Sequence, residues 1–448
     1  MPAPATSTDR STRADVVVIG AGVAGLAAAR RLHGRGFRVL VLEARRRIGG
    51  RVFTRRDLRS VVPIELGAEF LHGDAPEVYA IADEARQPVV SISGDRWHAA
   101  HGRFTRLDDF WERLDRILGQ ADADREPDRP LSALFAERPG GRRFAEDRTL
   151  AREFVEGFHA AELDRISERA IADGGNPGAD AEQQRIGRLI GGYDVVPTWL
   201  ATPVASRIRL GSAVSAIDWS PGRVVVRTHG GTAAVTARAA IVTVPVSLLH
   251  ADARGRGSIA FTPEVDRIRE AAGLLAMGQV QRIAVLFDRP LVELLDDRRK
   301  ARLADMTFVQ ARGTDVPVWW TSHPVRSGLV VAWAGGPAAI ALGTSPRALP
   351  SRVIASLSDV FRLDRRTVQR HLIATMHHDW SRDPFSRGAY SYALVGGVYA
   401  ADALARPVRG TLFFAGEATD PEGRTGTVHG AIATGQRAAA QAMRALSS

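Results

Sequence analysis

The chain has 448 residues, of which 45% are hydrophobic and 25% are charged, the proportions of a soluble globular protein. This length exceeds what one ordinary hydrophobic core serves, so two domains are expected. The absence of cysteine excludes disulfides, thiolate metal sites, cysteine nucleophiles and a cofactor linked through cysteine. The net charge is +10, but the basic residues, all arginine except Lys300, are scattered among acids. A solvated surface is therefore the better interpretation, and no nucleic-acid partner is expected.

The start of the chain and its longest apolar run bear on location. Residues 1–13 lack the apolar centre of a signal peptide and predict a disordered leader. The apolar run at residues 239–249 is too short to cross a bilayer and contains Pro245. These features predict a cytoplasmic protein with no membrane anchor. The oligomeric state stays open, with a homodimer as one option.

The first predicted unit is a strand, a glycine-rich turn, a helix and a second strand. The β-branched run Val16–Ile19 predicts a parallel strand covered on both faces. The turn that follows fits G-x-G-x-x-G with Gly20, Gly22 and Gly25. The first glycine permits the turn, the second admits a pyrophosphate, and the third brings the helix at residues 26–32 close to the strand. This pattern predicts a dinucleotide-binding unit.

The second strand, residues 37–42, ends at Glu43, where a carboxylate would bind a ribose 2′-hydroxyl and repel a 2′-phosphate. NADP is therefore disfavoured. A second glycine pair, Gly49 and Gly50, followed by Arg51, comes next. An NAD-binding fold does not need this pair. It suits a longer cofactor, such as FAD, that extends past the first turn.

The remaining elements alternate between insertions and returns to the first unit. A mostly helical stretch follows, in which residues 150–171 have apolar positions at helical spacing. Residues 207–230 alternate like an antiparallel hairpin. Residues 280–287 and 329–333 predict strands and residues 350–361 a helix. A strand at residues 411–415, a loop and a final helix close the chain.

In combination these stretches resemble the flavin-containing amine oxidase family, which includes monoamine oxidases, polyamine and spermine oxidases and related histone demethylases. The matching stretches are E-A-x-x-x-x-G-G-R from Glu43, ELGAEFLHGDAPEVY from Glu65 with Phe70 where relatives have tryptophan, and FFAGEAT with GTVHGAIATGQRAA near the end. The resemblance covers about residues 14–440. It implies an α/β fold with a Rossmann-like FAD-binding domain and a second, α+β substrate-binding domain formed by insertions.

The resemblance also implies a division of the chain. Residues 14–76, 203–260 and 381–448 would form the FAD-binding domain, and residues 77–202 and 261–380 the substrate-binding domain. FAD is expected to be held without a covalent link. The implied cofactor-binding residues are Gly20, Gly22, Val23, Ala24, Gly25, Glu43, Ala44, Gly49, Gly50, Arg51, Gly67, Ala68, Glu69, Phe70, Val214, Trp380, Gly416, Glu417, Thr427 and Val428. Thr427 and Val428 would place N–H groups at the flavin pyrimidine, where reduction adds negative charge.

The resemblance places the substrate amine beside the flavin, between aromatic rings. Tyr390 is the expected wall of this cage, whereas Thr427 stands where monoamine oxidases have a second tyrosine. Trp380 adds to the aromatic segment. His72 is expected to bind the amine through a neutral nitrogen, with a structural histidine as the competing interpretation. No metal is expected, and the small-molecule partners are an amine and oxygen.

Two arginines raise separate questions. Arg282 stands where most family members have a lysine near flavin N5. A buried lysine can exchange a proton near neutral pH, whereas arginine stays charged. Oxygen activation is then slower, or oxygen is not the natural electron acceptor. Arg424, in the loop above the flavin, offers a partner for a substrate carboxylate, although a surface arginine is the favoured interpretation.

The leading hypothesis is an FAD-dependent amine oxidoreductase. Hydride would pass from the carbon next to nitrogen to flavin N5, the imine would hydrolyse to an aldehyde or ketone, and oxygen would become hydrogen peroxide. The alternatives are a related flavoprotein such as a desaturase, porphyrinogen-type or amino-acid oxidase, a dehydrogenase that uses another acceptor, and a flavin-binding interaction protein without catalysis. The sequence does not identify the amine.

Overall fold

Strand β1 (Val16–Ile19) lies at the centre of a five-stranded, all-parallel sheet in the order β10-β2-β1-β14-β23. The computed structural model describes residues 13–100, 102–174, 185–231 and 234–447. The expected leader, residues 1–13, lies outside this range except for Arg13. The other strands of the sheet are β2 (Val39–Leu42), β10 (Ile208–Arg209), β14 (Ala239–Val242) and β23 (Leu412–Phe414).

Alternate side chains of the parallel sheet enter two different core clusters. Val16 and Val18 pack with helices α1 (Val23–His33) and α14 (Val428–Ser447). Val17 and Ile19 pack against the second sheet, in the order β13-β12-β11-β15. Its strands are β11 (Val214–Ser220), β12 (Arg223–Thr228), β13 (Val235–Ala237) and β15 (Ala260–Thr262). Both faces of β1 are therefore covered, which explains why its sequence is continuously apolar.

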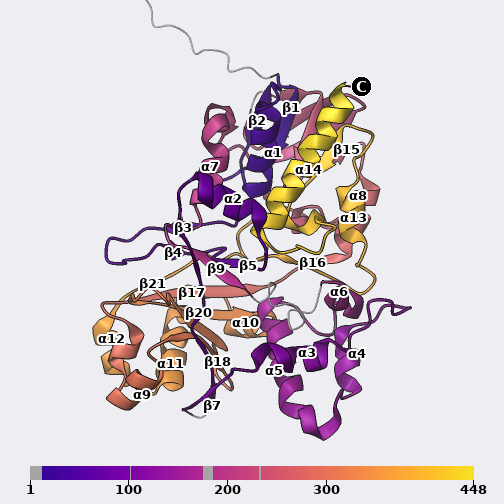
Figure 1. Ribbon diagram of the computed structural model, residues 1–448. Coiled ribbons are helices and arrows are strands. Elements are labelled where there is room, and N and C mark those ends of the chain that lie inside the picture. The colour runs from indigo at the N-terminus through magenta and orange to yellow at the C-terminus, as the bar shows by residue number, and fades with distance from the viewer. Residues whose placement is uncertain (1–12, 101, 175–184, 232–233, 448) are drawn as a thin grey trace, which may run out of the picture.

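The closing helix α14 lies beside the opening helix α1 in the upper part of Figure 1. The first and last segments of the chain thus form one layer on the parallel sheet. Helices α2 (Pro76–Glu84) and α7 (Val195–Ala201) pack in the same cluster. Helices α8 (Asp266–Gly273) and α13 (Ala400–Ala405) pack together in the cluster behind the sheet.

A seven-stranded sheet, in the order β21-β17-β20-β19-β18-β7-β8, forms the lower part of the molecule (Figure 1). Its strands are β7 (Asp95–Ala100), β8 (Arg103–Arg106), β17 (Val280–Phe287), β18 (Met306–Ala311), β19 (Val318–Thr321), β20 (Leu329–Gly335) and β21 (Leu372–His377). The helices of this part are α3 (Phe110–Leu118), α4 (Leu131–Ala136), α5 (Ala145–Phe158), α6 (Glu168–Asp173), α9 (Asp297–Arg302), α10 (Gly336–Leu342), α11 (Ala348–Phe361) and α12 (Arg365–His371).

Three small sheets lie between the two large ones. One has the order β5-β9-β6, another pairs β3 with β4, and the third pairs β16 with β22. Their strands are β3 (Thr54–Arg55), β4 (Ile64–Glu65), β5 (Phe70–His72), β6 (Val89–Ser91), β9 (Ile186–Leu189), β16 (Leu275–Met277) and β22 (Ser391–Ala393). The first and third of these sheets join segments that are distant in sequence, whereas β3 and β4 lie close together along the chain.

The core clusters divide the chain differently from the expected domain boundaries. Helices α2 and α7, expected in the substrate-binding part, share the core of the parallel sheet. Helix α8 and strand β16 likewise belong to the core behind that sheet. The buried side chains Val78 and Ile81 of α2 pack in the cluster that contains α14. The apolar faces of α2, α7 and α8 thus pack in the cores around the parallel sheet, although the sequence assigned these segments to the substrate-binding domain.

The helical pattern at residues 150–171 is interrupted in the structure. Helix α5 ends at Phe158, and Ala160 has a positive φ of 53°. A new helix, α6, begins after Ser167, whose hydroxyl accepts a hydrogen bond from Ala170 N at 3.0 Å. The carbonyls at the end of α5 bind side chains from elsewhere, and this segment lines the cavity described below. Within the described residues, no helix combines the length and apolarity needed to cross a membrane.

Candidate active site

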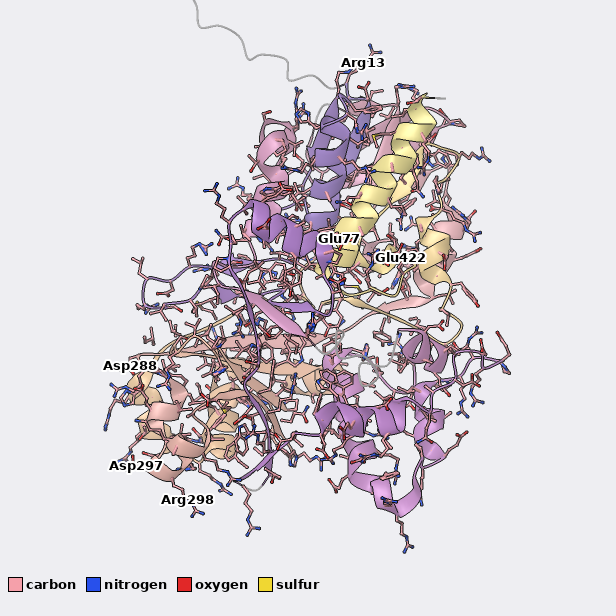
Figure 2. The ribbon with its side chains drawn as sticks, in the orientation of Figure 1. Arg13, Glu77, Asp288, Asp297, Arg298 and Glu422 are labelled. Carbon is pink, nitrogen blue, oxygen red and sulfur yellow. The ribbon has the colours of Figure 1, made fainter. Side chains whose placement is uncertain are left out.

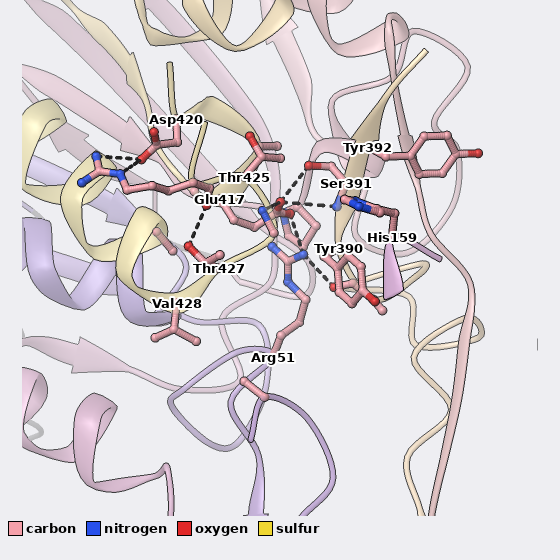
Figure 3. Close-up of a pocket in the computed structure, with 18 of the residues that line it drawn as sticks. Arg51, His159, Tyr390, Ser391, Tyr392, Glu417, Asp420, Thr425, Thr427 and Val428 are labelled. Atoms are coloured by element: carbon pink, nitrogen blue, oxygen red, sulfur yellow. Dashed lines mark hydrogen bonds and ion pairs between the residues drawn. The ribbon is translucent and has the colours of Figure 1, made fainter. Parts of the chain in front are cut away.

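A cavity of about 1440 Å³ lies between the parallel sheet and the seven-stranded sheet. It is lined from both sides, by the glycine-rich turn after β1 and by residues of β7, β17, β18 and β19. Every residue predicted from the sequence as a catalytic or cofactor-binding residue lines this cavity, except Gly25. Figure 3 shows the part around Glu417 and Tyr390.

Gly25 lies behind the turn rather than facing the cavity. A Cβ at this position would lie 2.0 Å from the carbonyl oxygen of Gly20. Gly25 therefore allows helix α1 to pack against the turn, while Gly20, Gly22, Val23 and Ala24 line the cavity. The N-cap residue of the helix is Gly22, which has no side chain to occupy the first N–H groups of α1. The start of α1 is thus accessible to a phosphate, which its N–H groups and dipole would stabilise.

The second glycine pair packs directly on the first turn. Gly49 N donates to the carbonyl of Ala21 at 2.8 Å, and Gly49 forms a bridge with Gly22. A Cβ on Gly50, which has a φ of +59°, would lie 3.1 Å from the Cα of Gly22. Two backbone turns therefore make one continuous surface for a long ligand.

Glu43 directly follows strand β2 and is 3% exposed. Its carboxylate accepts hydrogen bonds from Ala21 N at 2.7 Å and from Arg45 N at 2.8 Å. It therefore holds the glycine-rich turn in place while lining the cavity beside Ala44. Val214, at the start of β11, lines the same end. Glu43, Ala44 and Val214 therefore line the same cavity as the glycine-rich turn.

Glu417 links three segments at the other end of the cradle. One carboxylate oxygen accepts from Arg51 Nη1 at 2.7 Å, and the same nitrogen donates to Ala389 O at 2.8 Å. The other oxygen accepts from Ser391 Oγ at 2.7 Å and from Gly426 N at 3.0 Å. Figure 3 shows these contacts converging on the carboxylate. Glu417 therefore holds the loop before α14, and Gly416 lines the cavity beside it.

Thr427 acts as a cap for helix α14. Its hydroxyl donates to Arg424 O at 2.6 Å and accepts from Gly430 N at 3.0 Å. The backbone N–H of Thr427 also donates to Arg424 O, at 3.3 Å. Val428 then starts the helix at the cavity. The positive end of α14 therefore faces the cavity, where it would stabilise negative charge on a ligand.

Arg282 lies on strand β17 and is 3% exposed. Its Nη2 pairs with Glu69 Oε2 at 2.5 Å, and its Nε donates to Glu65 O at 3.0 Å. Glu69 is also bound by Arg188 at 2.8 Å and by Trp320 Nε1 at 3.0 Å. Arg282 is therefore a fixed cation.

One N–H donor of Arg282 is not used in these contacts. Within the described residues, the buried Nη1 of Arg282 has no hydrogen-bond partner. Since Arg282 lines the cavity, a bound cofactor or water can satisfy this donor. This orphaned group, the continuous glycine surface and the free start of α1 together fit a flavin dinucleotide.

Gly67, Ala68, Glu69 and Phe70 line the middle of the cavity. Gly67 lies against the backbone of Arg51, where a Cβ would be 1.9 Å from its carbonyl oxygen. The Phe70 ring packs against Phe308 and Trp320, at centroid distances of 5.7 and 5.5 Å. The segment therefore joins the cofactor cradle to an aromatic wall.

Tyr390 and His72 lie in this aromatic region. Tyr390 donates from its hydroxyl to Phe158 O at 2.5 Å, and burial raises the pKa of this phenol well above its ordinary value. The His72 ring meets the Phe158 ring edge-on at 5.3 Å. Burial, with smaller effects of His429 and Arg96, lowers the pKa of His72 to about 4. His72 is therefore neutral at pH 7 and able to accept a hydrogen bond.

Trp380 lines the cavity but is otherwise a packing residue. It is 3% exposed, and its indole nitrogen donates to Leu66 O at 2.8 Å. Its ring lies 4.2 Å from that of His378. The indole N–H is thus already occupied within the chain, which leaves a ring face as its contribution to the site.

Arg424 is neutralised by its own chain. It pairs with Asp420 at 3.0 Å, with Glu422 at 2.9 Å and with Glu77 at 3.3 Å. Figure 2 shows Glu77 and Glu422 on either side of the lower end of α14. Three carboxylates around one guanidinium leave it a poor partner for a substrate carboxylate.

Several cavity residues carried no signal in the sequence. The following come from segments without a motif and reach the site through the fold: Arg96, Phe154, Phe158, His159, Phe308 and Trp320. His429 lies in the matched closing stretch GTVHGAIATGQRAA, where no role was predicted for it. Only the helical spacing of α5 indicated a buried face near Phe154. Burial lowers the pKa of His159 and of His429 to about 4, so both are neutral at pH 7. The chamber beyond the cofactor cradle is therefore mainly aromatic, with neutral imidazoles.

Comparisons with known proteins agree with this arrangement. A family model described as flavin containing amine oxidoreductase matches residues 23–443. Polyamine oxidase 2 of Arabidopsis thaliana is 29% identical over 460 residues, which cover 95% of this chain and 87% of that protein. Wild-type putrescine oxidase bound to putrescine superimposes with a TM-score of 0.79 at 21% identity, covering 96% of this chain and 99% of that one. Cyclohexylamine oxidase from Brevibacterium oxydans gives 0.78 at 19% identity, with coverages of 97% and 100%.

Proposed function

The chain belongs to the flavin containing amine oxidoreductase family and is an FAD-dependent amine oxidoreductase, and from this premise we propose the reaction it performs. A small amine is oxidised at the carbon next to nitrogen, the imine is hydrolysed to an aldehyde or ketone, and oxygen is reduced to hydrogen peroxide. One observation carries the proposal. A single cavity contains both the glycine-rich cradle and the aromatic chamber around Tyr390.

The division of labour follows from the residues that line the cavity. When bound, the flavin accepts the hydrogen and electron pair of the broken C–H bond and passes the electrons to an acceptor. The opening turn and the start of α14 would hold the two ends of FAD. Arg51 and Glu417 would hold the loop between them, because their ion pair joins the two segments.

The aromatic chamber would orient the amine. The Tyr390 hydroxyl is tied to Phe158 O, so its ring is held in one orientation. Phe70, Phe308 and Trp320 form a continuous apolar wall. Such a wall excludes water and favours one approach of the substrate.

His72 would receive the amine rather than exchange its proton. The neutral imidazole accepts a hydrogen bond from an N–H group and does not repel a cationic substrate on entry. An amine that has released its proton to solvent has its nitrogen lone pair available, so the adjacent carbon can give up hydride.

Arg282 favours a second candidate, a dehydrogenase with an acceptor other than oxygen. Its guanidinium is buried and paired with Glu69, so it supplies a fixed charge and no exchangeable proton. An oxidase and a dehydrogenase share every step up to the reduced flavin. They differ only in what takes the electrons away.

Rapid mixing of the purified holoenzyme with a panel of amines tests the proposal. Without oxygen, amines should bleach the visible flavin absorbance, whereas alcohols and saturated acids of the same size should not. Admission of oxygen should then restore the colour and release one peroxide per turnover. Reduction followed by slow reoxidation, with fast reoxidation by a quinone, identifies the dehydrogenase. No bleaching by any amine contradicts both candidates.

A further inference from the structure

The arginines that line the cavity differ in whether a carboxylate of the described residues pairs with them. Among the residues that the structure describes, five arginines line the cavity: Arg45, Arg51, Arg96, Arg282 and Arg424. Four of them form an ion pair with a carboxylate of the chain. The N···O distances are 2.8 Å for Arg45, 2.7 Å for Arg51, 2.5 Å for Arg282 and 3.0 Å for Arg424. Within the described part of the chain, the Arg96 guanidinium forms no ion pair and donates no hydrogen bond.

Aromatic rings hold Arg96 in place. Its Cζ lies 4.7 Å from the centroid of Phe308, 5.0 Å from Phe110 and 5.3 Å from Trp111. Arg96 and Phe308 are register partners on the neighbouring strands β7 and β18, and the other two rings come from α3. These rings attract the cation through their faces but accept none of its five directed N–H groups in the way an oxygen does.

The surroundings make an unpaired cation costly. Burial lowers the pKa of Arg96 to about 10, and no carboxylate of the described residues acts against this effect. The group nevertheless remains protonated at neutral pH. Ring contacts offset only part of the free energy of removing a charge from water, and an anion in the cavity would offset much more.

The position of Arg96 assigns this anion to the substrate rather than to FAD. The phosphate-binding turn and the start of α14 belong to the upper part of the molecule, whereas Arg96 lies on the seven-stranded sheet. Arg96 contacts the ring of Phe308, and the Phe308 ring contacts the Phe70 ring at a centroid distance of 5.7 Å. The Phe70 ring in turn contacts the ring of His72, the group expected at the amine, at a centroid distance of 5.9 Å. Arg96 therefore lies within the substrate chamber, beyond the amine position.

We propose that Arg96 binds a carboxylate at the end of the substrate remote from the oxidised amine. The preferred substrate class is then amines with a terminal carboxylate, such as straight-chain ω-amino acids. A planar guanidinium holds a carboxylate through two parallel N–H···O bonds. It repels the second ammonium group of a diamine, so diamines should be the poorest straight-chain substrates. This inference rests on the proposed oxidation of amines.

Three matched series test the proposal on the FAD-loaded enzyme. The first contains 4-aminobutyrate, 5-aminopentanoate and 6-aminohexanoate, the second the alkylamines of equal carbon number, and the third the corresponding diamines. The parent enzyme should reduce its flavin most efficiently, by kcat/KM, with one of the amino acids. Arg96→Met should lower the ratio of the amino-acid kcat/KM to the alkylamine kcat/KM by roughly 10- to 100-fold. It should raise the relative efficiency of the diamine.

A matched control is Arg103→Met, an exposed arginine on the adjacent strand β8, which should leave the ratio unchanged. Arg96→Lys, which keeps the charge but loses the two-pronged contact, should lie between the parent and Arg96→Met. Flavin content and the visible spectrum verify that each variant is folded. An equal loss with all three series, or an unchanged ratio, overturns the proposal.

A binding experiment separates this proposal from the proposed reaction. Pentanoate has the carboxylate but no amine and cannot be oxidised. It should raise the Tm of the parent holoenzyme and perturb its flavin spectrum, and both effects should be lost in Arg96→Met. If no amine reduces the flavin, the proposed reaction fails while this result still decides on Arg96. Absence of pentanoate binding to the parent counts against Arg96 even if every alkylamine is oxidised.

Discussion

Arg51 and Glu417 are separated by 366 positions in the sequence, and their side chains meet at 2.7 Å. The carboxylate is 5% exposed and also binds Ser391 and Gly426 N. The pair therefore closes the ring of segments around the cofactor cradle. A residue near the start of the chain and one near its end act as a single unit there.

Removal of the charge in this pair should weaken cofactor binding. Glu417→Gln keeps the shape of the side chain but loses a charge-assisted bond and leaves Arg51 partly unpaired. Hydrogen bonds to charged groups contribute about 1.5–3 kcal/mol, so the Kd for FAD should rise roughly 10- to 100-fold. Flavin release during dilution, followed by fluorescence, measures this directly.

Asp194→Asn provides the control for that experiment, because Asp194 pairs with Arg56 at 2.8 Å on the surface. Exposed ion pairs contribute about 0–1 kcal/mol, so this variant should keep its flavin. Equal flavin loss in both variants would contradict a special role for Glu417.

Gly25→Ala should disrupt the glycine-rich turn without adding an atom to the cavity lining. The added Cβ would lie 2.0 Å from Gly20 O, so α1 has to move away from the turn. Overpacking of this kind destabilises a protein by about 1–3 kcal/mol or more. We expect a lower Tm and little bound FAD. Gly273→Ala, where no atom lies within 4 Å of the new Cβ, should behave like the parent in thermal denaturation.

Acid should destabilise the protein through its buried histidines. Burial lowers the pKa of His159 from 6.5 to about 4, so the unfolded chain binds more protons between these values. The free energy of unfolding therefore falls as the pH falls through this window. His159→Gln, which does not titrate, should reduce the difference in Tm between about pH 7 and about pH 5.

The titration of Glu65 has the opposite effect on the free energy of unfolding over part of this pH range. Burial raises its pKa from 4.5 to about 7, so its contribution to stability falls as the pH rises between these values. Comparison of each variant with the parent at the same pH removes this background. His229→Gln, an exposed histidine, is the control. An identical pH slope in the parent and in His159→Gln would rule out the buried imidazole as a source.

Arg282→Lys should accelerate the return of electrons to oxygen. Lysine in this buried position can donate and regain a proton near neutral pH, whereas arginine cannot. Positioned proton transfer contributes about 10²–10⁴-fold, so an increase of about tenfold or more in the reoxidation rate is expected. Stopped-flow mixing of the reduced enzyme with oxygen measures it. An unchanged rate, with reduction by amine intact, shows that proton supply from this position does not limit reoxidation.

Much of the upper part of the molecule was predictable because its signals are local. The apolar run of β1 and the glycines of the turn constrain φ, ψ and packing within a few residues. Strand β1 was predicted with its observed bounds, and α1 was predicted in a shorter form. The helical prediction for residues 150–171 was wrong in its middle, since the end of α5 makes contacts with Trp333 and Tyr390 that its own sequence does not encode.

The amino-acid sequence by itself determined the fold class, the dinucleotide-binding turn and the family resemblance, because each depends on residues that are close together or on motifs that keep their order. Only the tertiary structure decided which charges are neutralised. Arg424 meets three carboxylates, Arg282 meets Glu69, and among the described residues Arg96 meets aromatic rings and no carboxylate. These partners come from distant strands and loops. The sequence around a charged residue therefore does not reveal which residue it pairs with. The character of the substrate chamber therefore emerges only once the two sheets enclose it.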